Sequence, residues 1–362
     1  MNSNLIKGEC AMRYKLAIIG YGGMGGWHHE NIRKSLPEIE VVGAYDIREE
    51  MLQKASEKGL RAYKSVEELL KDKTVDIVTI ATPNNFHKDY AIACLKAGKH
   101  VVCEKPVAMN AKELEEIIEV SKQEQKLFSI HQNRRWDKDY RIMKAIYDQN
   151  LIGKFYRIES RVQGSRRALH GWRGYKVNGG GMVLDWGVHM IDQLLWMFPE
   201  EVISVEAHLH NIFAPEVDDH FDVLLRFESG ITALVEVAMN CLVTQPRWYV
   251  CGVEGSAIIE DWDGNGKIVT IKEDSEMEWE DEIVYTSAGP TRTMAPRPKH
   301  TTKEMALPEV SVDWANYYKN IVGVLEGQEE LIVKPEEVLR VMKVIDIIFE
   351  AQARGCGIAC RI

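Results

Sequence analysis

The segment Lys99–Pro106, KHVVCEKP, combines strand-forming residues with groups that could do chemistry. Three strand formers are followed at once by a carboxylate, an ammonium group and a proline. Parallel strands present ligand-binding groups at their carboxyl ends, so Lys105 is positioned to face a bound molecule. The tripeptide Glu104-Lys105-Pro106 alone is more typical of a surface Glu-Lys pair before a turn. The other motifs of the chain are needed to choose between a surface pair and a ligand-binding lysine.

A second group of reactive side chains lies in the segment 166–192. The glycines Gly179–Gly181 precede a predicted helix in which Asp185 and His189 are four residues apart, a spacing that places both on one face. In a lone helix such a pair is more often exposed. The preceding loop is rich in aromatic and guanidinium groups, which are suited to gripping a sugar ring, and from it we expect Trp172 and Arg173 to contact substrate.

A glycine-rich turn could bind a cofactor that faces these reactive side chains. The predicted strand Tyr14–Ile19 runs into GYGGMG at 20–25, followed by a predicted helix over Met24–Ser35. This G-x-G-x-x-G context is typical of dinucleotide binding, with the pyrophosphate at the helix N-terminus. Asp46 lies 21 residues after Gly25, where a carboxylate can bind the ribose hydroxyls and repel a 2′-phosphate. The sequence therefore predicts NAD rather than NADP, although Arg48 could accommodate a phosphate.

Strands and helices alternate through the first part of the chain, which predicts an α/β fold with a doubly wound parallel sheet. The expected strands are 14–19, 40–45, 76–81, 99–103 and 127–130, and the expected helices are 24–35, 48–58, 66–70, 86–97 and 111–125. We expect a tail over residues 1–13 and a dinucleotide-binding domain over 14–135.

The alternation stops after Trp136, and residues 136–362 are predicted to form an α+β domain. Its expected strands are 155–163, 202–210, 221–227, 231–239 and 248–253, which lack intervening helices and suit a mostly antiparallel sheet. Helices are expected over 139–149, 312–325 and 335–353. The irregular segment 274–309 is too long for an ordinary connection, so we interpret it as an interaction arm or lid, with disorder as the alternative.

Four motifs with their spacing resemble the Gfo/Idh/MocA family of nicotinamide-dependent sugar and polyol oxidoreductases. They are GYGGMG at 20–25 with His28 after it, ATPNNFH at 81–87, AGKHVVCEKP at 97–106 and QNRRWD at 132–137. The glycine-rich entry and D-x-x-x-H of residues 179–189 also match. The resemblance implies a Rossmann domain followed by a large open sheet, whose outer face would form a homo-oligomer, with the last helix packed toward the cofactor domain.

The resemblance also implies roles for individual residues. Lys105, Asp185 and His189 would form the catalytic set, with a cis peptide between Lys105 and Pro106. The expected cofactor contacts are Gly20, Gly22, Gly23, Met24, Gly25, Asp46, Thr82, Pro83, Asn84, His87, Glu104 and Lys105. The expected substrate contacts are Arg134, Trp172, Arg173, Asp185 and His189.

The chemistry of these side chains suits oxidation of a secondary hydroxyl. His189 could take the hydroxyl proton as hydride leaves carbon, Asp185 could orient its imidazole, and Lys105 could stabilise the alkoxide. We expect no metal. A zinc site made from Asp185 and His189 with His208, His210 or His220 is the disfavoured alternative.

We expect an NAD-dependent dehydrogenase that acts on a sugar, glycoside or cyclic polyol, with C3 of a glucoside as the preferred position. Inositol dehydrogenase is the nearest alternative. A glycosidase that recycles tightly held NAD represents a second class, and a nucleotide-sensing module without activity a third, which the three reactive residues disfavour.

The composition is that of an ordinary soluble protein, with 45% hydrophobic and 28% charged residues. A net charge of −10 argues against nucleic acid as a partner. The seven cysteines form no CxxC pair, which indicates reduced thiols and a cytoplasmic protein, and no secretory leader or membrane span is predicted. The expected partner is a small-molecule substrate.

Overall fold

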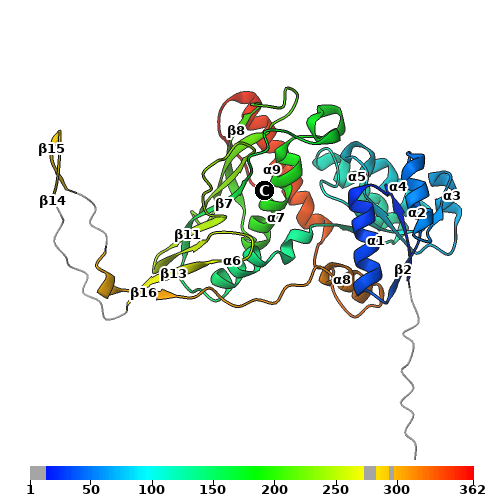
Figure 1. Ribbon diagram of the computed structural model, residues 1–362, viewed down its shortest axis with the longest axis horizontal. Coiled ribbons are helices and arrows are strands. Elements are labelled where there is room, and N and C mark those ends of the chain that lie inside the picture. The colour runs from blue at the N-terminus through cyan, green and yellow to red at the C-terminus, as the bar shows by residue number, and fades with distance from the viewer. Residues whose placement is uncertain (1–13, 273–282, 293–296) are drawn as a thin grey trace, which may run out of the picture.

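The computed structural model describes residues 14–272, 283–292 and 297–362. Two large sheets lie in it, each with its own helices (Figure 1). The predicted tail at 1–13 and the acidic block around Trp279 lie outside the described residues. Within the described part, no helix is both long and apolar enough to cross a membrane.

The first sheet is parallel and has the strand order β3-β2-β1-β4-β5-β6 of a doubly wound Rossmann fold. Its strands are β1 (Tyr14–Ile19), β2 (Ile39–Tyr45), β3 (Arg61–Ala62), β4 (Ile77–Ile80), β5 (His100–Cys103) and β6 (Phe128–Ile130). The connecting helices are α1 (Gly23–Ser35), α2 (Glu49–Glu57), α3 (Val66–Lys71), α4 (His87–Lys96) and α5 (Ala111–Glu124). The predicted elements are confirmed, and only the two-residue edge strand β3 was not anticipated.

The sequence of the central strands explains their place in this sheet. Every residue of β4 is buried, as expected for an apolar run covered by helices on both faces. The strand order reverses between β1 and β4, so the carboxyl ends of these two strands border a crevice. The turn after β1 and the Glu104-Lys105 pair after β5 therefore lie at the same edge of the sheet.

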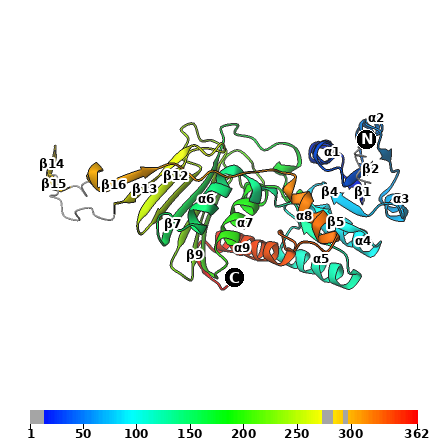
Figure 2. The same cartoon turned by 90° about the horizontal axis from the view of Figure 1, so that it is seen from below.

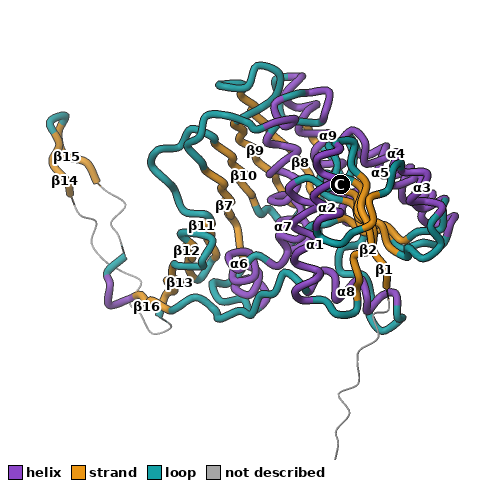
Figure 3. The backbone as a smooth tube through the Cα atoms, turned by 45° about the vertical axis from the view of Figure 1, so that its right-hand side comes forward, coloured by secondary structure: helices purple, strands orange, loops and turns teal. Residues whose placement is uncertain are grey.

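The second sheet has nine strands in the order β16-β13-β12-β11-β7-β10-β9-β8-β17, and all its pairs are antiparallel except β7 with β10. Figure 3 shows the strands from β13 to β8 side by side. The predicted strands are confirmed as β7 (Phe155–Gln163), β8 (Val202–His210), β9 (His220–Phe227), β10 (Thr232–Ala238) and β11 (Trp248–Gly252). Four further strands were not predicted: β12 (Gly255–Ile259), β13 (Gly266–Ile271), β16 (Thr302–Met305) and β17 (Ile358–Ala359). These are short, and two of them begin with glycine, so their sequences carry little strand signal.

Helices cover one face of the second sheet and join it to the first (Figure 2). They are α6 (Lys138–Asp148), α7 (Val188–Met197) and α9 (Pro335–Arg354), and α9 also contacts α5 of the first sheet. Helix α8 (Asn316–Leu325) returns to the first sheet, where the Tyr318 hydroxyl lies 3.2 Å from Thr79 Oγ1. Residues from the end of the chain thus complete the packing around its beginning.

Part of the expected arm belongs to the second sheet, because β16 pairs with β13 along its edge. Strands β14 (Ile283–Thr286) and β15 (Gly289–Arg292) form a separate hairpin, which Figure 1 shows beyond β16 and away from the first sheet. The rest of the expected arm falls partly on residues that are not described. The oligomer expected through the open sheet stays a prediction.

Candidate active site

A cavity of about 830 Å³ lies at the crevice edge of the first sheet and reaches residues of the second half of the chain. Most of the predicted cofactor residues line it: Gly20, Gly22, Gly23, Met24, Asp46, Thr82, Pro83, Asn84, Glu104 and Lys105. All predicted substrate residues also line it: Arg134, Trp172, Arg173, Asp185 and His189. The fold therefore brings together residues that are up to 169 positions apart in the chain, from Gly20 to His189.

Two predicted cofactor residues, Gly25 and His87, lie behind the cavity wall instead of lining it. A side chain at Gly25 would overlap the carbonyl of Gly20, so the glycine allows α1 to approach the turn. The buried His87 ring lies 2.8 Å from the Pro106 carbonyl and 2.9 Å from the Thr82 carbonyl. Both residues shape the wall by holding the backbone behind it.

The turn after β1 has the geometry that a dinucleotide requires. Gly20 has φ of +91°, and a Cβ there would lie 2.5 Å from the Ala81 carbonyl oxygen. Asp46 accepts hydrogen bonds from the backbone N–H groups of Tyr21, at 2.8 Å, and Arg48, at 2.9 Å. The half-exposed Arg48 side chain pairs with the same carboxylate at 3.3 Å. Asp46, which favours NAD, and Arg48, which could accommodate the 2′-phosphate of NADP, therefore contact each other.

Lys105 joins the two halves of the cavity. The Lys105–Pro106 peptide is cis, as the family resemblance implied. Its ammonium group donates to Oδ1 of Asp185 and to the Asp185 carbonyl, both at 2.8 Å. The other carboxylate oxygen of Asp185 accepts from Arg173 Nε at 3.2 Å. Burial alone raises the pKa of Asp185, but the Lys105 and Arg173 cations outweigh it and lower that pKa below its ordinary value.

The contact expected between Asp185 and the His189 imidazole is not formed, so that prediction is wrong. Asp185 is bound to Lys105 and Arg173, and the Nδ1 atom of His189 instead pairs with Oε1 of Gln132 at 2.8 Å. The predicted single helix is also two segments, a π-helical turn over Val183–Gly187 and then α7. The π turn changes the angular spacing of the two side chains, and such turns are frequent at functional sites.

His189 is held in its neutral form. Burial, together with the Lys105 and Arg134 cations, lowers its pKa well below the ordinary histidine value. A neutral imidazole can accept a proton, and the nearby Lys105 ammonium group can stabilise negative charge on oxygen. The arrangement therefore offers a base and a cation within one cavity.

The glycine run before Asp185 is required by close backbone packing. A side chain at Gly180 would overlap the Arg173 carbonyl, and one at Gly181 would overlap the Asp218 carboxylate. Asp218 lies in the β8–β9 connection and accepts the Val183 N–H at 2.7 Å, while its carbonyl accepts the Met182 N–H. Asp218 thus caps the segment that carries Asp185, a role that the sequence did not suggest.

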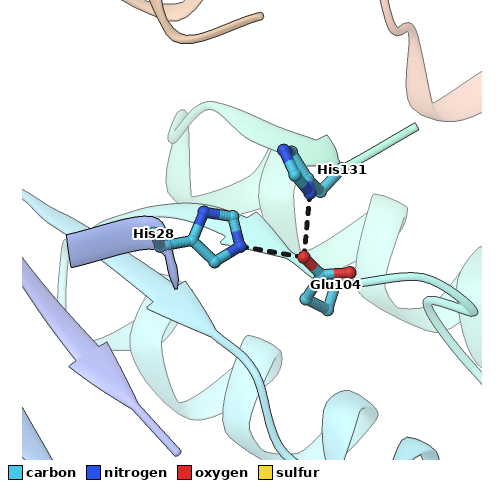
Figure 4. A group of neighbouring side chains, drawn as sticks. All are labelled: His28, Glu104 and His131. Atoms are coloured by element: carbon cyan, nitrogen blue, oxygen red, sulfur yellow. Dashed lines mark hydrogen bonds and ion pairs between the residues drawn. The ribbon is translucent and has the colours of Figure 1, made fainter. Parts of the chain in front are cut away.

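Figure 4 shows a buried network of His28, Glu104 and His131. His28 Nε2 and His131 Nδ1 both lie 2.8 Å from Oε1 of Glu104, and the other oxygen of Glu104 accepts the Lys105 N–H at 3.1 Å. Burial alone raises the pKa of Glu104, but the two imidazoles outweigh it and hold that pKa well below its usual range. The Tyr318 hydroxyl lies 2.9 Å from His28 Nδ1 and extends the network to α8.

Two tryptophans, Trp172 and Trp186, line the part of the cavity that the second half of the chain forms. The Arg173 guanidinium stacks on Trp172, with 4.6 Å from its carbon to the ring centroid, and Arg134 stacks on Trp186 at 4.2 Å. Trp262, from the β12–β13 connection, packs against Trp186 with centroids 5.7 Å apart. Sequence reasoning assigned no role to Gln132, Trp186 or Trp262. Gln132 and Trp186 lie in motifs already singled out, whereas nothing in the sequence marks Trp262.

The zinc alternative at this site is not supported. His208, His210 and His220 do not line the cavity, and no group of potential ligands among the described residues includes Asp185 or His189.

Comparison with known proteins agrees with this geometry. Residues 14–132 match the family model described as "Oxidoreductase family, NAD-binding Rossmann fold", and residues 140–258 match the GFO/IDH/MocA C-terminal domain. Myo-inositol 2-dehydrogenase of Thermotoga maritima is 32% identical over 61% of the chain and 67% of that relative. The NADP-dependent scyllo-inositol 2-dehydrogenase of Bacillus subtilis is 26% identical over 93% of each.

A solved structure extends the similarity to nearly the whole chain. The NAD-binding protein of Listeria innocua is 44% identical, superposes with a TM-score of 0.92, and is covered over 99% of its length by 96% of this chain. Because the two family models and these relatives cover both halves of the molecule, the chain belongs to the GFO/IDH/MocA family of oxidoreductases with an NAD-binding Rossmann fold.

Proposed function

We propose that the protein is an NAD-dependent dehydrogenase that moves hydride between the nicotinamide and a secondary hydroxyl of a cyclic polyol or sugar. The observation that carries this proposal is the meeting of Lys105, Asp185 and His189 in the cavity that also contains the glycine-rich turn. Two of the relatives are inositol dehydrogenases, which favours an inositol as the cyclic polyol. The stacked Trp172 and Arg173 favour a larger substrate as second candidate, a glucoside oxidised at C3.

The residues present fit a dinucleotide. The Gly20–Gly25 turn and the N-terminus of α1 would hold the pyrophosphate, and Asp46 would accept hydrogen bonds from the adenosine ribose. The nicotinamide would then reach the Glu104 and Lys105 end of the cavity. Asn84 also lines the wall, and its buried side-chain amide oxygen has no hydrogen-bond partner among the described residues. When bound, NAD supplies the hydride acceptor.

The protein's own residues would manage the proton and the charge. Lys105 would bind the reacting hydroxyl oxygen and stabilise the alkoxide, held in place by Asp185. Neutral His189 would accept the proton. Arg173 and Trp172 would hold the ring, and Asp185 would keep both cations in position.

The test is a panel of inositols, glucose and methyl glucosides assayed for reduction of NAD and NADP, followed by location of the new carbonyl. In Lys105→Met, kcat is expected to fall at least about 1000-fold, while NAD still binds. Lys88→Met is the matched control, because Lys88 pairs with Glu116 away from the cavity. Survival of turnover in Lys105→Met within about tenfold would contradict the assignment.

The same preparation tests the glycosidase alternative. Net release of p-nitrophenol from p-nitrophenyl glycosides without added cofactor, and without accumulation of NADH, would replace the dehydrogenase proposal.

A further inference from the structure

Histidines of the β8–β9 pair converge on the face of the second sheet that lies opposite α7 and α9. In the antiparallel register, His210 at the end of β8 lies directly across from His220 at the start of β9, and His208 lies across from Asp222. Alternate residues of a strand point to one face, so these side chains all project to the same side. The intervening Phe221 and Val223 are buried on the other side.

The potential ligand atoms of His210, His220 and Asp222 all lie within 4.8 Å of one another. His220 Nε2 is 3.4 Å from Asp222 Oδ2, which is long for a hydrogen bond to a charged group. Zinc bonds of about 2.0–2.1 Å in a tetrahedron place neighbouring ligand atoms roughly 3.4 Å apart. The separation therefore matches two ligands of one ion.

The two imidazoles are available for such an ion. Their ring centroids lie 5.2 Å apart, with the planes tilted by 58°. Within the described part of the chain, the His210 side chain contacts the His220 ring and forms no hydrogen bond. The other histidine and carboxylate group, His28, Glu104 and His131, differs because both imidazoles already bond the same carboxylate oxygen in the buried interior (Figure 4).

We propose that His210, His220 and Asp222 bind one divalent ion of the zinc class. Two imidazole nitrogens and one carboxylate oxygen form a donor set that suits Zn²⁺ and related transition metals better than Mg²⁺ or Ca²⁺. Three protein ligands leave a fourth position for water. The site is separate from the cavity, because none of its ligands lines the cavity wall.

The position of this site gives binding a structural consequence. His210 and His220 flank the β8–β9 connection, whose Asp219 carboxylate accepts the N–H groups of Ile212, Phe213 and Ala214. The same connection carries Asp218, which caps the Val183–Gly187 turn. An ion that ties the two strands together at this point closes the base of the connection and stabilises it.

The test is calorimetric titration of Zn²⁺ into tag-free, chelator-treated, full-length protein at pH 7.5, with an apparent melting temperature measured alongside. We expect one Zn²⁺ per chain and a higher melting temperature with the metal. His220→Ala and Asp222→Asn are each expected to weaken binding at least about tenfold and to remove the thermal shift, while leaving the metal-free melting temperature within a few degrees.

His300→Ala is the matched control for adventitious binding, because His300 is an exposed histidine remote in sequence from the three ligands, and it should leave the affinity within about twofold. Co²⁺ in place of Zn²⁺ should give the intense visible absorption of a tetrahedral site. Absence of a Zn²⁺ equivalent, or binding that survives both His220→Ala and Asp222→Asn, would overturn the proposal.

Discussion

The side-chain oxygen of Gln132 lies 2.8 Å from Nδ1 of His189 and determines which imidazole nitrogen carries the proton. The orientation of the Gln132 amide is set by its nitrogen, which donates to the Val188 carbonyl at 3.3 Å. An amide oxygen only accepts hydrogen bonds, so Nδ1 of neutral His189 must be the donor. The lone pair therefore lies on Nε2, the atom that can act as base.

Replacing Gln132 should affect chemistry more than binding. In Gln132→Met, which keeps the volume and removes the acceptor, kcat is expected to fall about 10–100-fold, the range typical of partners that orient metal-ligating histidines. The KM for NAD should stay within about twofold, because Gln132 does not line the cavity. Steady-state kinetics check this, and an unchanged kcat would show that the contact does not set the tautomer.

Gln132→Glu should change the pH dependence of kcat/KM by raising the pKa of His189. Burial and the Lys105 and Arg134 cations lower the pKa of His189, so the neutral base persists to low pH in the natural protein. A carboxylate at position 132 stabilises the imidazolium and raises that pKa. The acidic limb of kcat/KM is expected to shift to higher pH, and a shift to lower pH would contradict the assignment of His189 as the base.

Local sequence patterns predicted the helices and strands better than the side-chain contacts between them. The strand, turn and helix around Gly20 depend on neighbouring residues, so their motif predicts them. The partner of His189 depends instead on how α7 packs against Gln132, 57 residues earlier in the chain. Tyr318 reaches His28 across 290 residues, a distance at which spacing carries no information.

Asp46 should control the choice between NAD and NADP. Its carboxylate accepts from the backbone and side chain of Arg48, and its charge would repel a 2′-phosphate. In Asp46→Ser, the ratio of kcat/KM for NAD to that for NADP is expected to fall at least about tenfold, because Arg48 is freed for the phosphate. Adding Arg48→Ala should reverse the gain with NADP. A natural protein that already prefers NADP would contradict the role given to Asp46.

Glu104 should make the stability of the folded protein decrease at acidic pH. Its folded pKa lies well below the unfolded value, because its bonds to His28 and His131 outweigh burial. Its contribution is therefore present above the unfolded pKa of about 4.3 and is lost as pH falls through the folded pKa. Glu104→Gln is expected to cost about 1–3 kcal/mol at pH 7, because its amide nitrogen would face the Lys105 N–H. Urea unfolding below pH 5 should show a smaller loss in this variant than in the natural protein.

Asp218 should give the opposite pH dependence of stability, because its contribution is lost as pH rises. Burial raises its pKa to about 6, above the ordinary aspartate value, so between about pH 4 and 6 the folded protein holds a proton that the unfolded chain has released. Its contribution to stability is full below that window and declines as pH rises through 6, by at most about 3 kcal/mol. Asp218→Asn keeps an acceptor for the Val183 N–H without the charge, so at pH 8 it should be at least as stable as the natural protein. Urea unfolding from pH 5 to 8 checks this, and an Asp218→Asn variant that is less stable at pH 8 would show that the charged cap outweighs burial.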